Sequence, residues 1–545
     1  MKLNTSKLTI LLASAFIFSL STITRMQAAP GDLDVLFGSG GIVSFPVSFT
    51  NSGTNFGSAQ AVAIQPDGKI VVAGTGYDST NVGFGLARFN SDGSPDPTFG
   101  SAGKVVTVFP AGSAFADAVI IQPDGKIVAA GGNDPYDYGY GDDPVNFNVL
   151  LARYNADGSL DPTFGIGGKI ISNVRDNTGG ANDIALQSDG KIVAVGSVLV
   201  SSGSDFLLMR YNSDGSLDNS FGPGGKVTTG FNAYNEYSSA IEVAIQSDGR
   251  IIAAGSSIGY GPPNRHNFTF ALARYYPDGS LDTSFGADGR VTTSTGGIES
   301  SAEATSVAIQ SDGKIVTGGD SYDGLSTNAT LARYNANGTL DSTFEAGGIA
   351  VTSFSHDSDS YVTDIAIQTD GRIVVAGRSI RKNFGDSTIP IGFALARYNT
   401  DGSLDLTFGA GGKIVTSFST EHLWASYEAA AAIQPDGKIV LAGYIGPLSA
   451  LFRYEGRTES ISNVAVSGRV LTPGGSGLRN ATVSLTDSQG EVRTVTTSSF
   501  GFYMFDNVTA GSTYTIAVSS RRYRYATQQL LVNATLTNVD FIGLE

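Results

Sequence analysis

The sequence predicts an all-β protein: a seven-bladed β-propeller followed by a small prealbumin-like or Ig-like β-sandwich. Short Val/Ile/Ala/Tyr runs separated by glycines dominate the 545 residues, of which 70 are glycine, and sustained helical periodicity is rare. Three short phrases each recur seven times at spacings of about 60 residues. After Tyr454 these phrases stop, and a different alternating pattern begins.

The three recurring phrases run in step along the chain. The glutamine of Q-x-D-G-K/R stands at Gln65, Gln122, Gln187, Gln246, Gln310, Gln368 and Gln434. The arginine of an A-R-Y-like phrase stands at Arg88, Arg153, Arg210, Arg274, Arg333, Arg397 and Arg453. The aspartate of D-x-x-F stands at Asp34, Asp96, Asp161, Asp218, Asp282, Asp341 and Asp405. Such regularity indicates one supersecondary unit repeated seven times.

Each repeat is expected to contain four strands. In the second repeat these are "GKVVTVF" (from Gly103), "DAVIIQ", "KIVAAG" and "NVLLARY", with "PDG" as a tight turn between the second and third. A single four-stranded sheet cannot bury its faces, so neighbouring sheets must pack on it. Seven sheets arranged radially form a propeller with short, protected edges. An open solenoid is the alternative, but it requires atypical capping repeats, and none is visible.

Four segments are expected along the chain: an export signal (1–28), the propeller (30–455), a linker (456–463) and the sandwich (464–545). Lys2 and Lys7 precede the apolar run "LTILLASAFIFSLSTI", and cleavage is expected near Ala28 or Ala29. The protein is then secreted or displayed at the cell surface, with no membrane span after cleavage. An uncleaved anchor is the alternative, which Arg25, behind the apolar run, keeps open.

Two parts of the chain resemble known families. "QPDGKIVVAG", "LARYNADGSLDPTFGIGGKI" and their copies resemble the delta-60 repeat family of bacterial secreted proteins, which implies a propeller-like repeat domain without an agreed activity. "GRVLTPGGSGLRNATVSL", "GFYMFDNVTAGSTYTIAV" and "TNVDF" resemble the carboxypeptidase regulatory-like domain, which has a prealbumin-like or carbohydrate-binding-like fold. The second resemblance does not imply a peptidase, because no zinc-ligand set accompanies it.

Composition excludes several classes of function. A net charge of −16 argues against a nucleic-acid partner, and the absence of cysteine rules out disulfides and thiol catalysis. No nucleotide-binding or hydrolase motif occurs. Three histidines, His266, His356 and His422, lie in unrelated variable connections. We therefore expect a monomer without cofactor and without catalytic residues.

The recurring charged residues are expected to be structural. The first six arginines each precede an aspartate by eight residues, as in Arg153–Asp161, Arg210–Asp218 and Arg397–Asp405, which suggests an ion pair bracing each corner between blades. A ring of binding charges is the alternative, but a binding site usually needs asymmetry. Asn155, Asp157 and Asp161 loosely resemble a Ca²⁺ loop, although Asx turns explain the same residues.

Ligand binding is expected at the face where the connections vary. One such connection carries Tyr136, Tyr138, Tyr140, Asp142 and Asp143, a combination suited to sugars or short peptides. The predicted function is a non-catalytic extracellular scaffold that binds a glycan or a protein. The alternative is an extracellular carbohydrate-active or other hydrolase that uses carboxylates on the propeller face. Carboxylates meeting in a deep axial pocket would favour the hydrolase, and a shallow aromatic groove would favour the binder.

Overall fold

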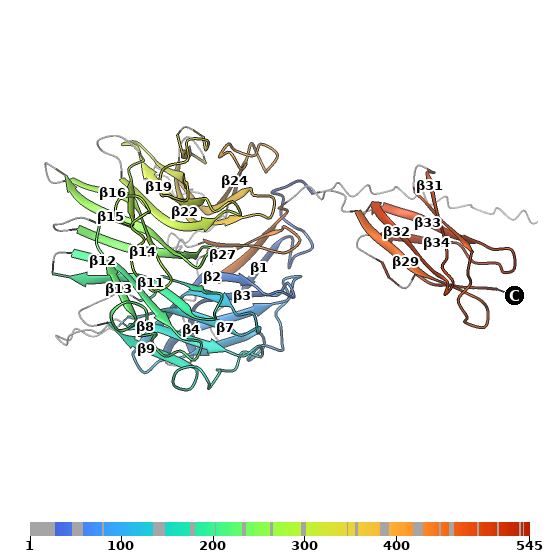
Figure 1. Ribbon diagram of the computed structural model, residues 1–545, viewed down its shortest axis with the longest axis horizontal. Helices are drawn as coiled ribbons and strands as arrows, with labels where there is room; N and C mark the ends of the chain where they lie inside the picture. The colour runs from blue at the N-terminus through green and yellow to red at the C-terminus, as the bar shows by residue number, and fades with distance from the viewer. Residues whose placement is uncertain are drawn as a thin grey trace, which may run out of the picture.

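The computed structural model is all-β, as the sequence predicts. It describes residues 28–45, 58–78, 81–134, 148–174, 180–201, 203–231, 236–261, 265–295, 301–345, 347–354, 358–381, 392–417, 429–445, 448–456, 463–487, 490–509, 512–532, 536–537 and 539–544. Within these residues the N-terminal part forms a ring of blades and the C-terminal part forms a second body (Figure 1). One short 3₁₀ turn, Pro223–Gly225, interrupts the β structure.

The described residues of the ring form seven four-stranded antiparallel units, numbered here as blades 1 to 7, and a short parallel contact joins the third and fourth units into one sheet. Blades 1 to 3 are β2 (Ala59–Ile64), β3 (Ile70–Asp78), β4 (Asn81–Phe89) and β5 (Lys104–Thr107); β6 (Ser113–Ile121), β7 (Ile127–Asp134), β8 (Asn148–Tyr154) and β9 (Lys169–Asn173); and β10 (Asp183–Leu186), β11 (Ile192–Val200), β12 (Gly203–Tyr211) and β13 (Lys226–Thr229).

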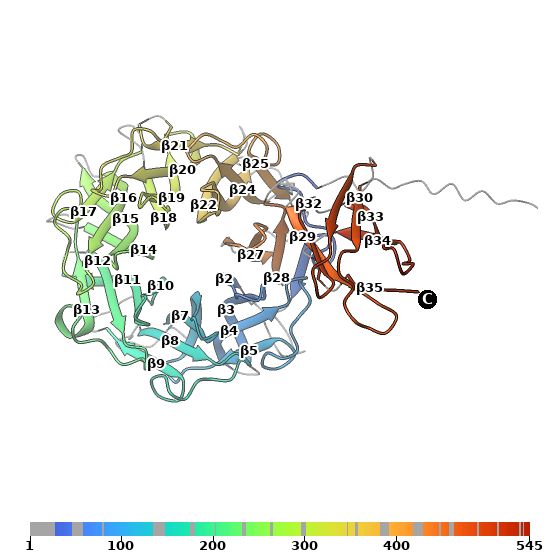
Figure 2. The same cartoon turned by 45° about the vertical axis from the view of Figure 1, so that its right-hand side comes forward.

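Blades 4 to 6 follow the same plan. They are β14 (Glu236–Ile245), β15 (Ile251–Gly261), β16 (Arg265–Tyr275) and β17 (Arg290–Thr293); β18 (Ser301–Ile309), β19 (Ile315–Tyr322), β20 (Thr327–Tyr334) and β21 (Ile349–Thr352); and β22 (Ser358–Ile367), β23 (Ile373–Arg381), β24 (Gly392–Tyr398) and β25 (Lys413–Ser417). In each blade the strand that ends directly before the repeat glutamine lies nearest the axis. Figure 2 shows this for β2, β10, β14, β18 and β22.

The strands are grouped differently from the expected repeat. The sequence repeat begins with "GKVVTVF", but in the structure β5 pairs with β4 and completes blade 1 as its outermost strand. The cause is the corner that joins the two strands. Arg88 N donates to Gly103 O (2.8 Å) and Asp96 N donates to Arg88 O (2.9 Å), so the chain folds back on the strand it has just left. Each blade therefore combines three strands of one sequence repeat with the first strand of the next.

This offset leaves blade 7 incomplete until the two ends of the ring meet. Blade 7 contains β26 (Ala429–Ile433), β27 (Ile439–Ile445) and β28 (Leu448–Tyr454), and its outer strand is the N-terminal β1 (Ile42–Phe45). Ile42 is paired with Phe452, and Arg453 Nη2 lies 2.6 Å from Asp34 Oδ2. The ring is thus closed by strand pairing between its first and last segments, which excludes the open solenoid.

The core of the ring lies between the blades. One buried cluster joins blade 1 and its corner to blade 2, and it contains Val71, Leu86, Phe99, Ile127 and Leu150. In blades 2 to 7 the residue after the repeat arginine is a tyrosine, which is fully buried and reaches the outer strand of the preceding blade. Tyr154, for example, donates its hydroxyl to Thr107 Oγ1 at 2.9 Å. Burial raises the pKa of this phenol, which keeps it a neutral donor.

The two faces of the ring differ in their connections. Because neighbouring strands are antiparallel, the β2–β3 and β4–β5 types of turn lie on one face, which we call the constant face. The β3–β4 and β5–β6 types lie on the opposite, variable face. At the constant face each Q-x-D-G turn is held by its aspartate; Asp124 Oδ1, for example, accepts a bond from Lys126 N at 3.1 Å. Repetition of this turn explains the repetition of the phrase.

The C-terminal body is a sandwich of two sheets. One sheet contains β32 (Phe502–Thr509), β29 (Asn463–Leu471) and β35 (Phe541–Ile542), and the other contains β31 (Val492–Thr496), β30 (Thr482–Thr486), β33 (Ser512–Ser519) and β34 (Gln528–Val532). Their inner faces enclose a core that includes Val466, Val483, Tyr503 and Ile516. The sequence prediction of a small β-sandwich is confirmed.

Candidate functional site

The structure describes only some of the residues singled out in the sequence. Tyr136, Tyr138, Tyr140, Asp142 and Asp143 lie in the connection between β7 and β8, outside the described residues. His356 and His422 also lie outside them, and His266 is in β16. The binding cluster expected on the variable face therefore remains a prediction.

The repeated arginines and aspartates form ion pairs at the corners of the blades. Arg153 Nε donates to Asp161 Oδ2 at 2.8 Å, and the two side chains are 7% and 4% exposed. The equivalent distance is 2.8 Å for Arg210–Asp218 and 2.9 Å for Arg397–Asp405.

Each corner arginine also connects two blades. The Arg153 guanidinium lies 4.5 Å from the ring centre of Phe164, and its Nη1 donates to the backbone oxygen of Ser213, in the corner of the next blade. Bonds to Thr163 and the nearby cations, Lys126 and Arg153, together outweigh the effect of burial and hold the pKa of the Asp161 carboxyl well below its usual range. These groups serve every blade alike, which is the behaviour of a structural element.

The candidate Ca²⁺ ligands have other partners in the structure. Asp157 Oδ1 accepts bonds from Ser159 N and Oγ, at 2.9 and 2.7 Å, in an Asx turn. Asn155 Nδ2 donates to Ser159 Oγ at 3.0 Å, and both oxygens of Asp161 accept bonds from protein donors. Across the part of the chain that the structure describes, no group of three or more His, Asp or Glu side chains is placed to hold a metal ion.

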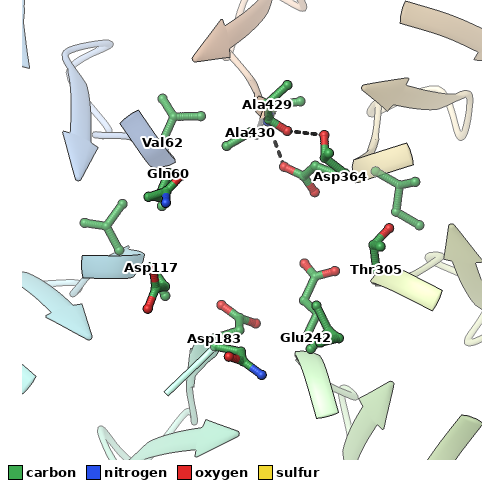
Figure 3. A pocket seen from close by; sticks show the side chains of 17 residues that line it. Gln60, Val62, Asp117, Asp183, Glu242, Thr305, Asp364, Ala429 and Ala430 are labelled. Atoms are coloured by element: carbon green, nitrogen blue, oxygen red, sulfur yellow. Dashed lines mark hydrogen bonds between the residues drawn. The ribbon is translucent and has the colours of Figure 1, made fainter. Parts of the chain in front are cut away.

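A cavity of about 610 Å³ lies on the axis of the ring, where the inner strands meet (Figure 3). Its wall comes from the middle of each inner strand, where a bulge shifts the pairing register in five blades, as between Ala116 and Ala118. A bulge re-aims side chains locally, and here it turns them toward the axis. Asp117, Asp183, Glu242 and Asp364 surround the opening in Figure 3.

Two positions of the repeat supply most of the polar wall. The fifth residue before the repeat glutamine, here called the bulge position, is Gln60, Asp117, Asn182, Ile241, Thr305, Thr363 and Ala429 in blades 1 to 7. The fourth, here called the capping position, is Ala61, Ala118, Asp183, Glu242, Ser306, Asp364 and Ala430. The rest of the inner strand is uniformly apolar near the glutamine. These two positions therefore break the seven-fold symmetry of the ring.

Capping residues of blades 3 to 6 bind the next blade. Along the cavity the inner edge of each inner strand has no partner strand, so its backbone amides face the axis; only the start of β14 pairs with β12. Asp183 Oδ2 accepts a bond from Val243 N (2.9 Å), and Glu242 accepts one from Val307 N.

The same relay continues through blades 5 to 7. Ser306 Oγ accepts a bond from Ile365 N at 3.0 Å, and Asp364 Oδ2 accepts one from Ala431 N at 2.7 Å. Four successive junctions are thus joined through side chains at the axis.

The remaining junctions lack this device. Their capping residues are Ala430, Ala61 and Ala118, whose methyl groups cannot accept a hydrogen bond. The amides of Val62 and Val119, which occupy the same register as those capped elsewhere, therefore receive no acceptor from the capping residue of the preceding blade. Gln60 Oε1, on the same side of the cavity, is buried without a hydrogen-bond partner. This part of the wall therefore offers an unused acceptor, the amide oxygen of Gln60.

The carboxyls at the axis have raised pKa values. Protein encloses them and withholds the water that would solvate the charged form, and this raises the pKa of Asp183 to about 7 and that of Asp364 to about 6. Burial and the neighbouring carboxyls of Asp364 and Asp183 raise the pKa of Glu242 well above its ordinary value. No Lys, Arg or His is among the residues that line the cavity. Near neutral pH the wall thus contains carboxyls that both donate and accept hydrogen bonds.

The sequence alone does not reveal this cavity. A signal was nevertheless present, because aligning the seven repeats on their glutamines shows two polar, variable positions within a constant apolar strand. Recognising it requires knowing that this strand lies innermost.

Comparison with solved structures finds similar chains at low identity. The polysaccharide lyase Uly1 is 11% identical with a TM-score of 0.41, covering 73% of this chain and 89% of that chain. An ulvan lyase bound to -[GlcA(1-4)Rha3S]- is 11% identical with a TM-score of 0.42, covering 74% and 95%. Sqt1 of Chaetomium thermophilum, bound to the N-terminus of a ribosomal protein, is 12% identical with a TM-score of 0.40, covering 76% and 100%. Likeness this distant carries no functional argument.

Family models match both parts of the chain. No curated protein matches it. A domain of unknown function described as the DUF5122 beta-propeller matches residues 65–99, 122–164, 187–221, 246–285, 310–344 and 368–408, and the carboxypeptidase regulatory-like domain matches residues 465–542. Within the described residues no helix is long and apolar enough to span a membrane. The chain is therefore a β-propeller of DUF5122 repeats, which resemble delta-60 repeats, joined to a carboxypeptidase regulatory-like domain.

Proposed function

We propose that this protein is an exported, non-catalytic scaffold that binds a neutral glycan, with one sugar residue held in the axial cavity. The observation that carries the proposal is the mixed wall of that cavity. The unpartnered amide oxygen of Gln60 offers an acceptor on one side, and the carboxyls of Asp183 and Asp364, with pKa values of about 7 and about 6, offer donors or acceptors on the other. Sugar hydroxyls both donate and accept, so they suit both sides.

The charge and size of the cavity narrow the ligand further. A wall with several carboxyls and no basic side chain repels uronic and sulfated sugars, which favours neutral ones. A volume of about 610 Å³ falls in the usual range for small-molecule sites. We propose that the remainder of the glycan lies across the variable face, where the loop that carries Tyr136, Tyr138 and Tyr140 offers aromatic rings.

A second candidate function is hydrolysis, because the carboxyls do meet in an axial pocket. Glycoside hydrolysis by a carboxyl pair needs one protonated and one ionised group, so the surroundings must push their pKa values apart. Here burial raises the pKa of Asp183, Glu242 and Asp364 in the same direction. Each of the three also accepts an amide bond from the next blade, which fixes it as part of the ring. Both facts favour binding over catalysis.

A glycan array probed with the secreted protein tests this proposal. We expect retention of neutral glycans and little retention of uronic or sulfated ones. Gln60→Leu should abolish retention, because it removes the unpartnered amide oxygen without breaking a hydrogen bond of that oxygen in the fold. Asp124→Asn, in an exposed turn of the constant face, is the matched control and should retain the same glycans.

Two results would contradict the binding proposal. Retention of acidic glycans alone, or undiminished retention by Gln60→Leu, would remove the axial site. Release of reducing sugars from the retained glycans would replace the binder with the hydrolase.

Export is the other part of the proposal, and it rests on the apolar segment behind Lys2 and Lys7. Mass spectrometry of the protein recovered from the culture medium should show a mature N-terminus near Ala28 or Ala29. Recovery of the chain only from the cytoplasm, with Met1 in place, would contradict it.

A further inference from the structure

The outer face of one sandwich sheet carries large apolar side chains in contact with solvent. Along β32 every second residue points outward, and Phe502 and Met504 are each 54% exposed. On β35 and just beyond it, Ile542 is 62% and Leu544 58% exposed, and Phe500 before β32 is 69% exposed. Soluble domains seldom expose so many large apolar side chains on one sheet without a partner.

Strand register places these side chains on a single face together with two arginines. In the β29–β32 pair, Arg469 stands opposite Phe502, and in the β29–β35 pair Leu471 stands beside Ile542. Leu544 is bridged to Arg524, which is exposed. Residues paired directly across a ladder share a face. The surface formed by Phe500, Phe502, Met504, Ile542 and Leu544 with Arg469 and Arg524 is called the apolar–arginine face below.

Arg469 lies within this face with hydrogen-bonding capacity to spare. Its guanidinium carbon is 4.8 Å from the ring centre of Phe502, and its Nη2 donates to Phe500 O at 3.3 Å. Its Nε is buried and has no hydrogen-bond partner. The nearby carboxyl of Asp540 is bound to the backbone N of Arg469 rather than to its side chain (2.7 Å). The Nη2 bond to Phe500 O lies at the surface, so an oxyanion arriving from outside would meet the guanidinium there, among apolar groups.

The charge of the C-terminal body differs from that of the ring. Residues 463–545 contain six arginines and five acidic residues, whereas residues 30–456 contain 24 basic and 44 acidic residues. An anionic surface therefore repels the propeller and not the sandwich, so the sandwich is the part of the chain able to approach it.

We propose that the apolar–arginine face docks the protein on a lipid surface with anionic headgroups. Phenyl, thioether and aliphatic side chains fit among acyl chains at the headgroup boundary, and arginines at the same level meet phosphate groups. A glycan fits this face less well, because Met504, Ile542 and Leu544 are thioether or aliphatic side chains, which do not stack on sugars. The proposal is independent of the axial cavity.

Co-sedimentation of the secreted protein with vesicles tests this proposal. Phosphatidylcholine vesicles with phosphatidylglycerol should bind the protein, and phosphatidylcholine alone should bind it about ten-fold less. Phe502→Ser/Met504→Ser should reduce binding to the anionic vesicles about ten-fold, and Arg469→Gln should remove most of the preference for the anionic lipid. Val492→Ser is the matched control: Val492 is 55% exposed on β31, in the other sheet, and its loss should change nothing.

Folding is checked independently: Phe502, Met504 and Val492 are exposed and Arg469 is partly exposed, so the far-UV circular dichroism of each variant should be unchanged. Three results would overturn the proposal: absence of vesicle binding by the unmodified protein, equal binding to both lipid compositions, or equal binding by Phe502→Ser/Met504→Ser and the unmodified protein. Retention of a protein partner by the face in place of lipid would also overturn it.

Discussion

Replacing Arg153 by methionine should destabilise the propeller far more than an ordinary surface charge deletion. The change removes the 2.8 Å bond to Asp161, the bond to Thr163 Oγ1 and the bond that Nη1 donates to Ser213 O in the next blade. It also leaves a carboxyl that is 4% exposed with Lys126 as its remaining cation. Breaking a buried ion pair on one side costs about 3–5 kcal/mol, and the residual contact with Lys126 favours the lower end of that range. Urea unfolding followed by circular dichroism should therefore show a loss of about 3 kcal/mol.

The matched control removes the other cation of the same carboxyl. Lys126 Nζ is 3.1 Å from Asp161 Oδ2, but the side chain is 31% exposed, so Lys126→Met should cost less than about 1 kcal/mol. Arg153→Lys should fall between the two, because it keeps the charge and loses the fork that reaches Thr163 and Ser213. If Arg153→Met and Lys126→Met were equally mild, the corner pair would not be bracing the blades.

Three further predictions concern the axis, the glycines and the Asx turns. Burial raises the pKa of Asp183 in the folded protein to about 7, from an ordinary 3.8. The stabilising contribution of the protonated carboxyl is therefore complete below pH 3.8 and is lost as the pH rises toward 7. The urea midpoint should fall across this pH window, and it should fall less in Asp183→Asn. A Cβ at Gly131 would lie 1.9 Å from Phe115 O, so Gly131→Ala should lower the free energy of unfolding in urea by about 1–3 kcal/mol. Gly125 has φ +83° and no atom near its Cβ position, so Gly125→Ala should lower it by about 1 kcal/mol. Equal losses would show that the inner strand moves aside freely. Added Ca²⁺ should leave the melting temperature unchanged, since the oxygens of Asp157 are already bonded in the turn, and a rise would restore the Ca²⁺ loop.

Local chemistry accounts for what could be predicted about the fold. The residues after Gln122 predict the turn, because proline, aspartate and glycine at successive positions favour a tight hairpin. The repeat count and the pattern of apolar runs then require sheets that pack on each other. The apolar pattern nevertheless predicts the wrong blade for the strand "GKVVTVF". Which neighbour it pairs with depends on the hydrogen bonds of the corner between Arg88 and Gly103, and those bonds are not visible in apolar periodicity.

The axial site could not be predicted for a related reason. Asp183, Glu242 and Asp364 are about 60 residues apart and look like isolated polar substitutions in apolar strands. They become neighbours only when the ring closes and their strands lie innermost. Their raised pKa values follow from that enclosure and from no property of the individual residues.

By itself, then, the sequence determined the repeated unit, its turns, the separate C-terminal domain and the corner partners eight residues apart, because all of these depend on contacts within one short stretch of chain. Tertiary structure alone decided that β1 completes blade 7, that Arg453 meets Asp34, and that the inner strands enclose a cavity. These features join residues up to 419 positions apart, as the bond from Arg453 to Asp34 shows. The free energy that holds them together comes from burial between blades, which exists only once every blade has a neighbour on both sides.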